Sequence, residues 1–142
     1  MGYRSDVTIV IYGEKDDVTA FVATERLKGL PKGVQHHPFK TPHTDHLYYE
    51  RDMYNYGDDK YTLMLFRWKN VKWYDTYPEM AYWVDLMSVW EDAFKNTLCL
   101  EYARVGEQAD DVEVNYYGEH IEYFLNIHTE VDEGSVPIKS TD

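Results

Sequence analysis

The feature that most constrains this fold is an apolar stripe of helical period between Tyr77 and Asn96. Its members follow one another at steps of three, one, three, three and four residues, the spacing of one helix face: Met80, Trp83, Val84, Met87, Trp90 and Phe94. Pro78 suits the first turn of such a helix. Large aromatic and thioether side chains on one face can bury much apolar area. The stripe therefore predicts a helix over 77–96 that packs against the sheet of this chain.

The rest of the chain alternates strand patterns with turn residues. A second helix is predicted from Asp16 or Asp17 to Lys28, and Gly57-Asp58-Asp59 predicts a hairpin turn. Strand patterns cover 7–12, 46–55, 60–69, 97–105, 112–117 and 121–131. The order β-α-β-β-α-β-β-β predicts an α+β two-layer sandwich, with a mostly antiparallel sheet of about six strands and two helices on one face. A ferredoxin-like variant fits this order. We expect one domain over 1–133 and a flexible C-terminal tail over 134–142.

Length and composition favour a cytoplasmic protein. The 142 residues suit a single domain, and no apolar run reaches the length of a membrane span. We expect no signal peptide, because the first residues are polar. Cys99 is the single cysteine and lies in a strand-like run, which predicts a small buried residue and no nucleophile.

Charge is distributed unevenly along the chain. The net charge is −12, and residues 107–142 carry ten acidic residues against one lysine. Basic and aromatic residues do interleave between Arg67 and Trp73, as they do in single-strand binders. The pI of about 4.8 nevertheless argues against direct nucleic-acid binding, since such a chain repels phosphate. A basic protein surface is the partner that this balance favours.

The acidic, tyrosine-rich segment near the C-terminus is the main candidate for partner binding. Its carboxylates, on neighbouring strands, could imitate a phosphate array and occupy a basic groove, with tyrosines as anchors. The candidate residues are Glu113, Tyr116, Tyr117, Glu119, Glu122 and Tyr123. The alternative is a solvated sheet face that charge keeps soluble.

A histidine-rich loop is the one metal-like cluster. His36, His37, His43 and His46 lie within eleven residues, beside Asp45. Imidazole and carboxylate groups are competent zinc ligands, but this spacing matches no established zinc pattern. Solvated loop histidines are the alternative reading.

No recognised catalytic motif is present, and we expect a protein that is not an enzyme and has no cofactor. The sequence contains no phosphate-binding loop and no G-x-S-x-G element. Two other functions stay open. One is a small-molecule binding or sequestering domain with a pocket near Trp83 and Trp90. The other is a metal-dependent enzyme that uses the histidine loop.

The opening Met1-Gly2-Tyr3-Arg4-Ser5-Asp6-Val7 resembles the start shared by small, uncharacterised proteins of phages and prophages. The resemblance covers the first predicted strand and implies a setting, the host cytoplasm during infection. Small acidic phage proteins are often inhibitors of host factors or defence systems. The leading hypothesis is therefore an acidic phage-type protein that binds and inhibits a host or anti-phage defence protein. A homo-oligomer also stays open.

Overall fold

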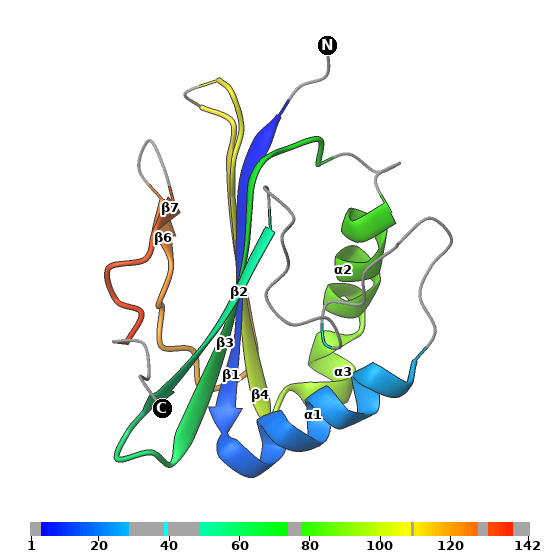
Figure 1. Ribbon diagram of the computed structural model, residues 1–142, viewed down its shortest axis with the longest axis vertical. Helices are drawn as coiled ribbons and strands as arrows, with labels where there is room; N and C mark the ends of the chain where they lie inside the picture. Colours follow the sequence, from blue (N-terminus) through cyan, green and yellow to red (C-terminus); the bar gives the residue numbers. More distant parts are fainter. Residues whose placement is uncertain are drawn as a thin grey trace.

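A five-stranded antiparallel sheet forms the centre of the computed structural model, in the order β2-β3-β1-β4-β5 (Figure 1). The structure describes residues 4–28, 39, 49–73, 78–108, 110–127 and 131–137. The sheet strands are β1 (Ser5–Glu14), β2 (Tyr49–Tyr56), β3 (Tyr61–Val71), β4 (Leu98–Val105) and β5 (Val112–Tyr117). The α+β class is confirmed. The main sheet has five strands in place of the expected six.

β1 is central because both of its faces are apolar. Val7, Ile9 and Ile11 point toward the helices, while Val10 and Tyr12 point to the opposite face, and none is more than 2% exposed. β3 and β4 flank β1, both antiparallel to it. A strand that is buried on two sides needs mostly apolar residues on both faces, and the run VTIVIY supplies them except at Thr8, whose buried hydroxyl donates a hydrogen bond to Glu133.

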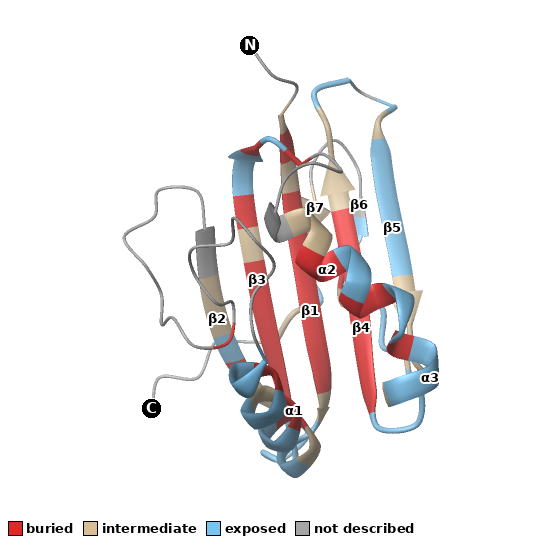
Figure 2. Ribbon diagram, turned by 90° about the vertical axis from the view of Figure 1, so that its right-hand side faces the viewer, coloured by how far each residue is buried: buried red, intermediate tan, exposed pale blue. Residues whose placement is uncertain are grey.

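Three helices cover one face of the sheet: α1 (Lys15–Leu27), α2 (Pro78–Ser88) and α3 (Trp90–Phe94) (Figures 1 and 2). The core between helices and sheet is aromatic. Trp83 lies at its centre, with ring centroids 4.9 Å from Phe66 and 5.8 Å from Trp68. Phe39, the one residue that the structure describes between 29 and 48, is 2% exposed and packs into the same cluster.

The helix predicted over 77–96 is interrupted at Val89. This residue has φ −105° and ψ 0°, outside the helical region, and α3 begins directly after it. The restart seats Trp90, which is fully buried and donates a hydrogen bond from its indole Nε1 to the Leu98 carbonyl at 3.2 Å. The interruption of the helix at Val89 therefore allows Trp90 to form a hydrogen bond with Leu98, the first residue of β4.

The buried face of α2 is rotated from the predicted stripe. Val84 is 44% exposed, so its assignment to the core is wrong. Tyr82 and Leu86 are buried in its place, at 8% and 6% exposure. Both lie four residues apart on one side of the helix, and Tyr82 donates a hydrogen bond to Glu25 of α1 at 2.9 Å.

The opposite face of the sheet is covered by the C-terminal segment, residues 119–127 and 131–137, which we call the arm (Figure 1). A strand over 121–131 was expected to extend the meander, and this expectation is wrong. Where the structure describes this segment, its regular structure is a two-stranded pairing of β6 (Asn126–Ile127) with β7 (Val131–Asp132). The chain turns across the sheet at Gly118, where φ is +115° and a Cβ would come within 2.8 Å of the Cys99 sulfur.

The arm is packed rather than loose within the described residues. Leu125 is 1% exposed, and Val131 and Val136 pack against the same apolar cluster. Glu133 accepts hydrogen bonds from the Arg67 guanidinium on β3. The predicted tail over 134–142 thus begins, at 134–137, in contact with the sheet, and its remainder lies outside the described residues.

Candidate functional site

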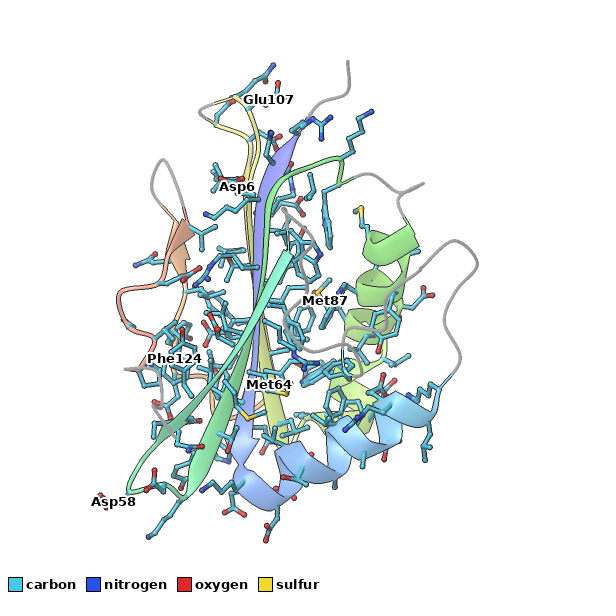
Figure 3. The ribbon with its side chains drawn as sticks, viewed as in Figure 1. Asp6, Asp58, Met64, Met87, Glu107 and Phe124 are labelled. Carbon is cyan, nitrogen blue, oxygen red and sulfur yellow. The ribbon has the colours of Figure 1, made fainter. Side chains whose placement is uncertain are left out.

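One end of the sheet collects acidic side chains from four segments. β1, β2 and β5 finish there, β3 and β4 begin there, and α1 starts and α3 finishes beside them (Figure 1). We call this surface the acidic end; Figure 3 marks Asp58 on it and Glu107 at the opposite end of the molecule. Its carboxylates are Glu14, Asp16, Asp17, Asp58, Asp59, Glu91, Asp92, Glu119 and Glu122. Against these nine stand three lysines, Lys15, Lys60 and Lys95.

Backbone hydrogen bonds join the segments of the acidic end. The Lys15 amide donates to the Lys60 carbonyl at 3.0 Å, which ties the start of α1 to the β2–β3 hairpin. The Glu119 amide donates to the Lys95 carbonyl at 3.1 Å, which ties the start of the arm to the end of α3. The Gly118 amide donates to the Glu91 carboxylate at 2.9 Å. The charges are therefore carried by connected turns with fixed relative positions.

A cavity of about 490 Å³ opens at the acidic end. Such a volume falls within the range of roughly 300–1,000 Å³ that is common for small-molecule sites. Its lining combines aromatic, charged and small polar groups from every segment of this end: Tyr12, Gly13, Glu14, Asp17, Tyr56, Tyr61, Lys95, Asn96, Thr97, Leu98, Cys99, His120 and Glu122.

The cavity carries negative charge from its carboxylates alone. Burial raises the pKa of Tyr56 above its usual range, and the nearby Glu122 carboxylate adds to this effect. Burial likewise raises the pKa of the Cys99 thiol. Both groups are therefore neutral at physiological pH. A protonated, 5% exposed thiol is a poor nucleophile, which argues against cysteine catalysis in this cavity.

A buried carboxylate beneath the cavity holds the arm in place. Glu101 on β4 is 0% exposed and accepts a hydrogen bond from the Tyr12 hydroxyl at 2.7 Å. It also accepts the backbone amides of Phe124 at 3.0 Å and Leu125 at 2.9 Å. The Glu122 amide donates to the Tyr12 hydroxyl at 2.9 Å. Because side chains satisfy these backbone donors, the arm needs no neighbouring strand there.

The predicted partner-binding residues do not share one face. Glu113 and Tyr117 lie on the helix side of β5, where Glu113 accepts a hydrogen bond from Arg104 at 2.6 Å and Tyr117 packs against the helix-side core. Tyr116 lies on the arm side and donates a hydrogen bond to the Leu125 carbonyl at 3.1 Å. Tyr116 also packs edge-on against Tyr123, with ring centroids 4.8 Å apart.

Two of the six lie at the acidic end. Glu122 lines the cavity. Glu119 accepts hydrogen bonds from the Asn96 side-chain amide at 2.9 and 3.0 Å when that amide is turned with its nitrogen toward the carboxylate. Glu113 lies at the other end of β5, beside the Arg104 and Asp111 ion pair. The structure thus brings Glu119 and Glu122 together with acidic residues from elsewhere and separates them from Glu113.

Most residues of the acidic end were missed by sequence reasoning. Asp16 and Asp17 were interpreted only as helix-cap residues and Asp58-Asp59 only as a turn, and Glu14 was given no role. The available signal was topological, because every second connection between antiparallel strands lies at the same end of the sheet. The step that sequence reasoning omitted was to sum charge over those turns.

The other predicted sites are the histidine cluster and the pocket near Trp83 and Trp90. His36, His37, His43 and His46 lie outside the described residues. Within the part of the chain that the structure describes, no three His, Cys, Asp or Glu side chains converge as metal ligands. Trp83 and Trp90 are both fully buried and line neither of the two cavities seen at the acidic end and beside α1.

Two buried tyrosines should make the fold sensitive to alkali. Burial raises the pKa of Tyr12 and of Tyr102 well above the normal range, whereas an unfolded phenol titrates near pH 10. Above about pH 10 the unfolded chain loses protons that the folded chain retains, so stability falls by about 1.4 kcal/mol per pH unit for each tyrosine. Urea unfolding followed between neutral and alkaline pH measures this slope. Tyr102→Phe should reduce the slope by the contribution of one tyrosine, about 1.4 kcal/mol per pH unit. An unchanged slope would contradict the raised pKa of Tyr102.

Comparison of the chain with protein-family models, curated proteins and solved structures found no match. Within the described residues, no helix is long and apolar enough to cross a membrane.

Proposed function

We propose that this chain is an acidic, phage-type binding protein without enzymatic activity, which attaches to a basic surface of a host or anti-phage defence protein and inhibits it. The observation that carries the proposal is the acidic end. Its nine carboxylates and three lysines give a net charge of −6 with histidine neutral, which is half of the chain's −12. A rigid surface of one sign attracts and orients a partner of opposite sign.

The geometry supports a binding surface more than a catalytic one. The carboxylates of the acidic end are mostly exposed, and they stand on turns that hydrogen bonds join to one another. A groove that normally receives nucleic acid is one basic surface that such an array fits. The resemblance of the N-terminal residues to phage proteins supports the setting, the cytoplasm of an infected bacterium.

The test compares two double charge reversals that change the net charge equally. Glu14→Lys with Glu122→Lys alters the acidic end. Asp85→Lys with Asp110→Lys alters exposed residues outside it. A partner captured from bacterial lysate and identified by mass spectrometry is then titrated against each variant. We expect the acidic-end variant to weaken binding about tenfold or more, since both pairs turn from attractive to repulsive.

The control variant should weaken binding by less than about threefold, because salt screens distant exposed charges. Increasing salt should weaken the unmodified protein more than the acidic-end variant. Equal loss in both variants would show that only net charge matters, and no partner at low salt would count against the proposal.

We also propose a ferredoxin-like frame for the fold. The succession β1-α1-β2-β3-α2-β4, with α3 as the continuation of α2, supports it. So does the position of β1 between β3 and β4, with the helices on one face. β5 and the arm would then be additions to that frame.

A further inference from the structure

The cavity at the acidic end has one aromatic wall. The rings of Tyr56 and Tyr61 stack with centroids 5.3 Å apart and planes inclined at 24°, across the hairpin that joins β2 to β3. Tyr61 is 36% exposed, so its ring is open to a ligand. Gly57 has φ +61°, and a Cβ built there would come within 2.5 Å of the Tyr61 ring. The turn therefore lies directly against this ring and holds it in position.

The remaining rim of the cavity is negatively charged. Glu14 and Asp17 come from the junction of β1 and α1, and Glu122 comes from the arm. Lys95 is the one lysine in the lining, and His120 is the one histidine. With His120 neutral the lining carries a net charge of −2. An electron-rich ring beside several carboxylates is an environment that favours an organic cation.

The spacing of the carboxylates favours a large planar cation over a metal ion. Among the described residues, no three potential ligands converge closely enough to hold a metal. A guanidinium group is planar and weakly hydrated, stacks on aromatic rings, and offers donors in several directions to separate carboxylates. An ammonium group is compact and strongly hydrated, and it gains less from an aromatic wall.

We propose that this cavity receives a guanidinium group, the side chain of an arginine on the basic partner surface. The proposal rests on the proposed function and adds to it the chemistry of the anchor. Tyr61 supplies the stacking surface, while Glu14 at the end of β1 and Glu122 in the arm accept hydrogen bonds from the guanidinium. The volume of about 490 Å³ also accommodates backbone next to the side chain.

The first experiment uses the free protein and small probes. L-argininamide is titrated against the amide resonances of the ¹⁵N-labelled chain, with L-citrullinamide as the control, which has the same shape and the same α-amino group but an uncharged urea in place of the guanidinium. We expect saturable shifts at Gly13, His120 and Glu122 with argininamide and none with citrullinamide. Equal shifts with both probes, or argininamide shifts elsewhere on the chain, would overturn the proposal.

Variants give expectations of opposite sign. Glu14→Gln with Glu122→Gln should weaken argininamide binding roughly tenfold, and Tyr61→Leu should weaken it about threefold. Lys95→Gln should strengthen binding, because it removes the lysine that repels the ligand. Thermal unfolding of each variant checks that the fold is retained. Unchanged affinity in all three variants would show that argininamide binds elsewhere.

Competition with the captured partner separates this inference from the proposed function. If argininamide displaces the partner and citrullinamide does not, the arginine belongs to the partner. If argininamide binds without displacing the partner, the partner does not place an arginine in this cavity. Glu14→Lys with Glu122→Lys could abolish partner binding while Tyr61→Leu and Lys95→Gln leave it unchanged. In that case the acidic end binds the partner without an arginine in the cavity. That last result would overturn the inference and leave the proposed function intact.

Discussion

Replacing Glu101 by alanine should lower the free energy of unfolding by roughly 3 kcal/mol or more, because two buried donors and one partly buried donor lose their acceptor at about 1–3 kcal/mol each. Glu101 is 0% exposed and accepts the Tyr12 hydroxyl and the amides of Phe124 and Leu125. Urea unfolding monitored by circular dichroism measures the loss.

The loss should be localised in the arm before it is global. Hydrogen exchange at Phe124 and Leu125 should become fast in Glu101→Ala, since their amides no longer have an acceptor. Amides in the centre of β1 should stay protected at low denaturant. This pattern would show that the arm opens as a unit while the sheet and helices remain folded.

The conservative variant Glu101→Gln keeps the size and shape of the side chain and removes its negative charge. An amide has one acceptor oxygen where the carboxylate has two, so some of the three donors stay unsatisfied and an intermediate loss is expected. Glu113→Ala is the control on the neighbouring strand. Its carboxylate is about half exposed, and its partner Arg104 keeps its ion pair with Asp111, so the loss should stay below about 1 kcal/mol. Equal losses for Glu101→Ala and Glu113→Ala would contradict the anchoring role.

Residue periodicity was sufficient for two strands that differ in burial: β3 is largely buried, whereas no residue of β5 is buried. The strand over 60–69 is observed as β3 (Tyr61–Val71), and the strand over 112–117 is observed within the same bounds as β5. In both, side chains alternate between the faces of the sheet, which a short window of sequence can show. The hairpin at Gly57 followed from turn residues alone and is confirmed by the pairing of β2 with β3.

The arm could not be predicted from its own residues. IEYFLNIHTEV has the composition of a strand, and its local preference is overridden by acceptors that lie elsewhere in the chain. Glu101 does leave a trace in the sequence. It lies between Cys99 and Ala103 on a face of β4 that is otherwise apolar, and a carboxylate at such a position needs buried donors. Its partners are 23 and 24 residues away, beyond any local pattern.

The acidic end escaped prediction for a related reason. Its charges come from short turns, each of which is ordinary by itself, and only strand pairing brings them together. Glu14 and Glu122 are 108 positions apart in sequence yet line one cavity. The composition shows that the C-terminal region is acidic. Which surface concentrates the negative charge depends on the order of the strands in the sheet, which composition does not give.

The second large effect should follow from Trp83→Ala on α2. The Trp83 side chain is fully buried, with its ring centroid 4.9 Å from Phe66 and 5.8 Å from Trp68 and from Phe39. Truncation removes this contact area and leaves a cavity, which costs about 3–5 kcal/mol for a tryptophan. Val84→Ala is the matched control in the same helix and should change stability by less than about 0.5 kcal/mol, since Val84 is 44% exposed.

A third variant tests how the Trp83 indole contributes. Its Nε1 is buried and has no hydrogen-bond partner among the described residues, so this N–H opposes folding while the ring area favours it. Trp83→Phe removes the unpaired donor and keeps most of the aromatic area, and we expect it to lose much less stability than Trp83→Ala. Urea unfolding of the three variants at one pH measures the order. A loss for Trp83→Phe as large as for Trp83→Ala would mean that the indole nitrogen is paired in solution. A large loss of stability for Val84→Ala would instead show that Val84 faces the core, as the sequence predicted.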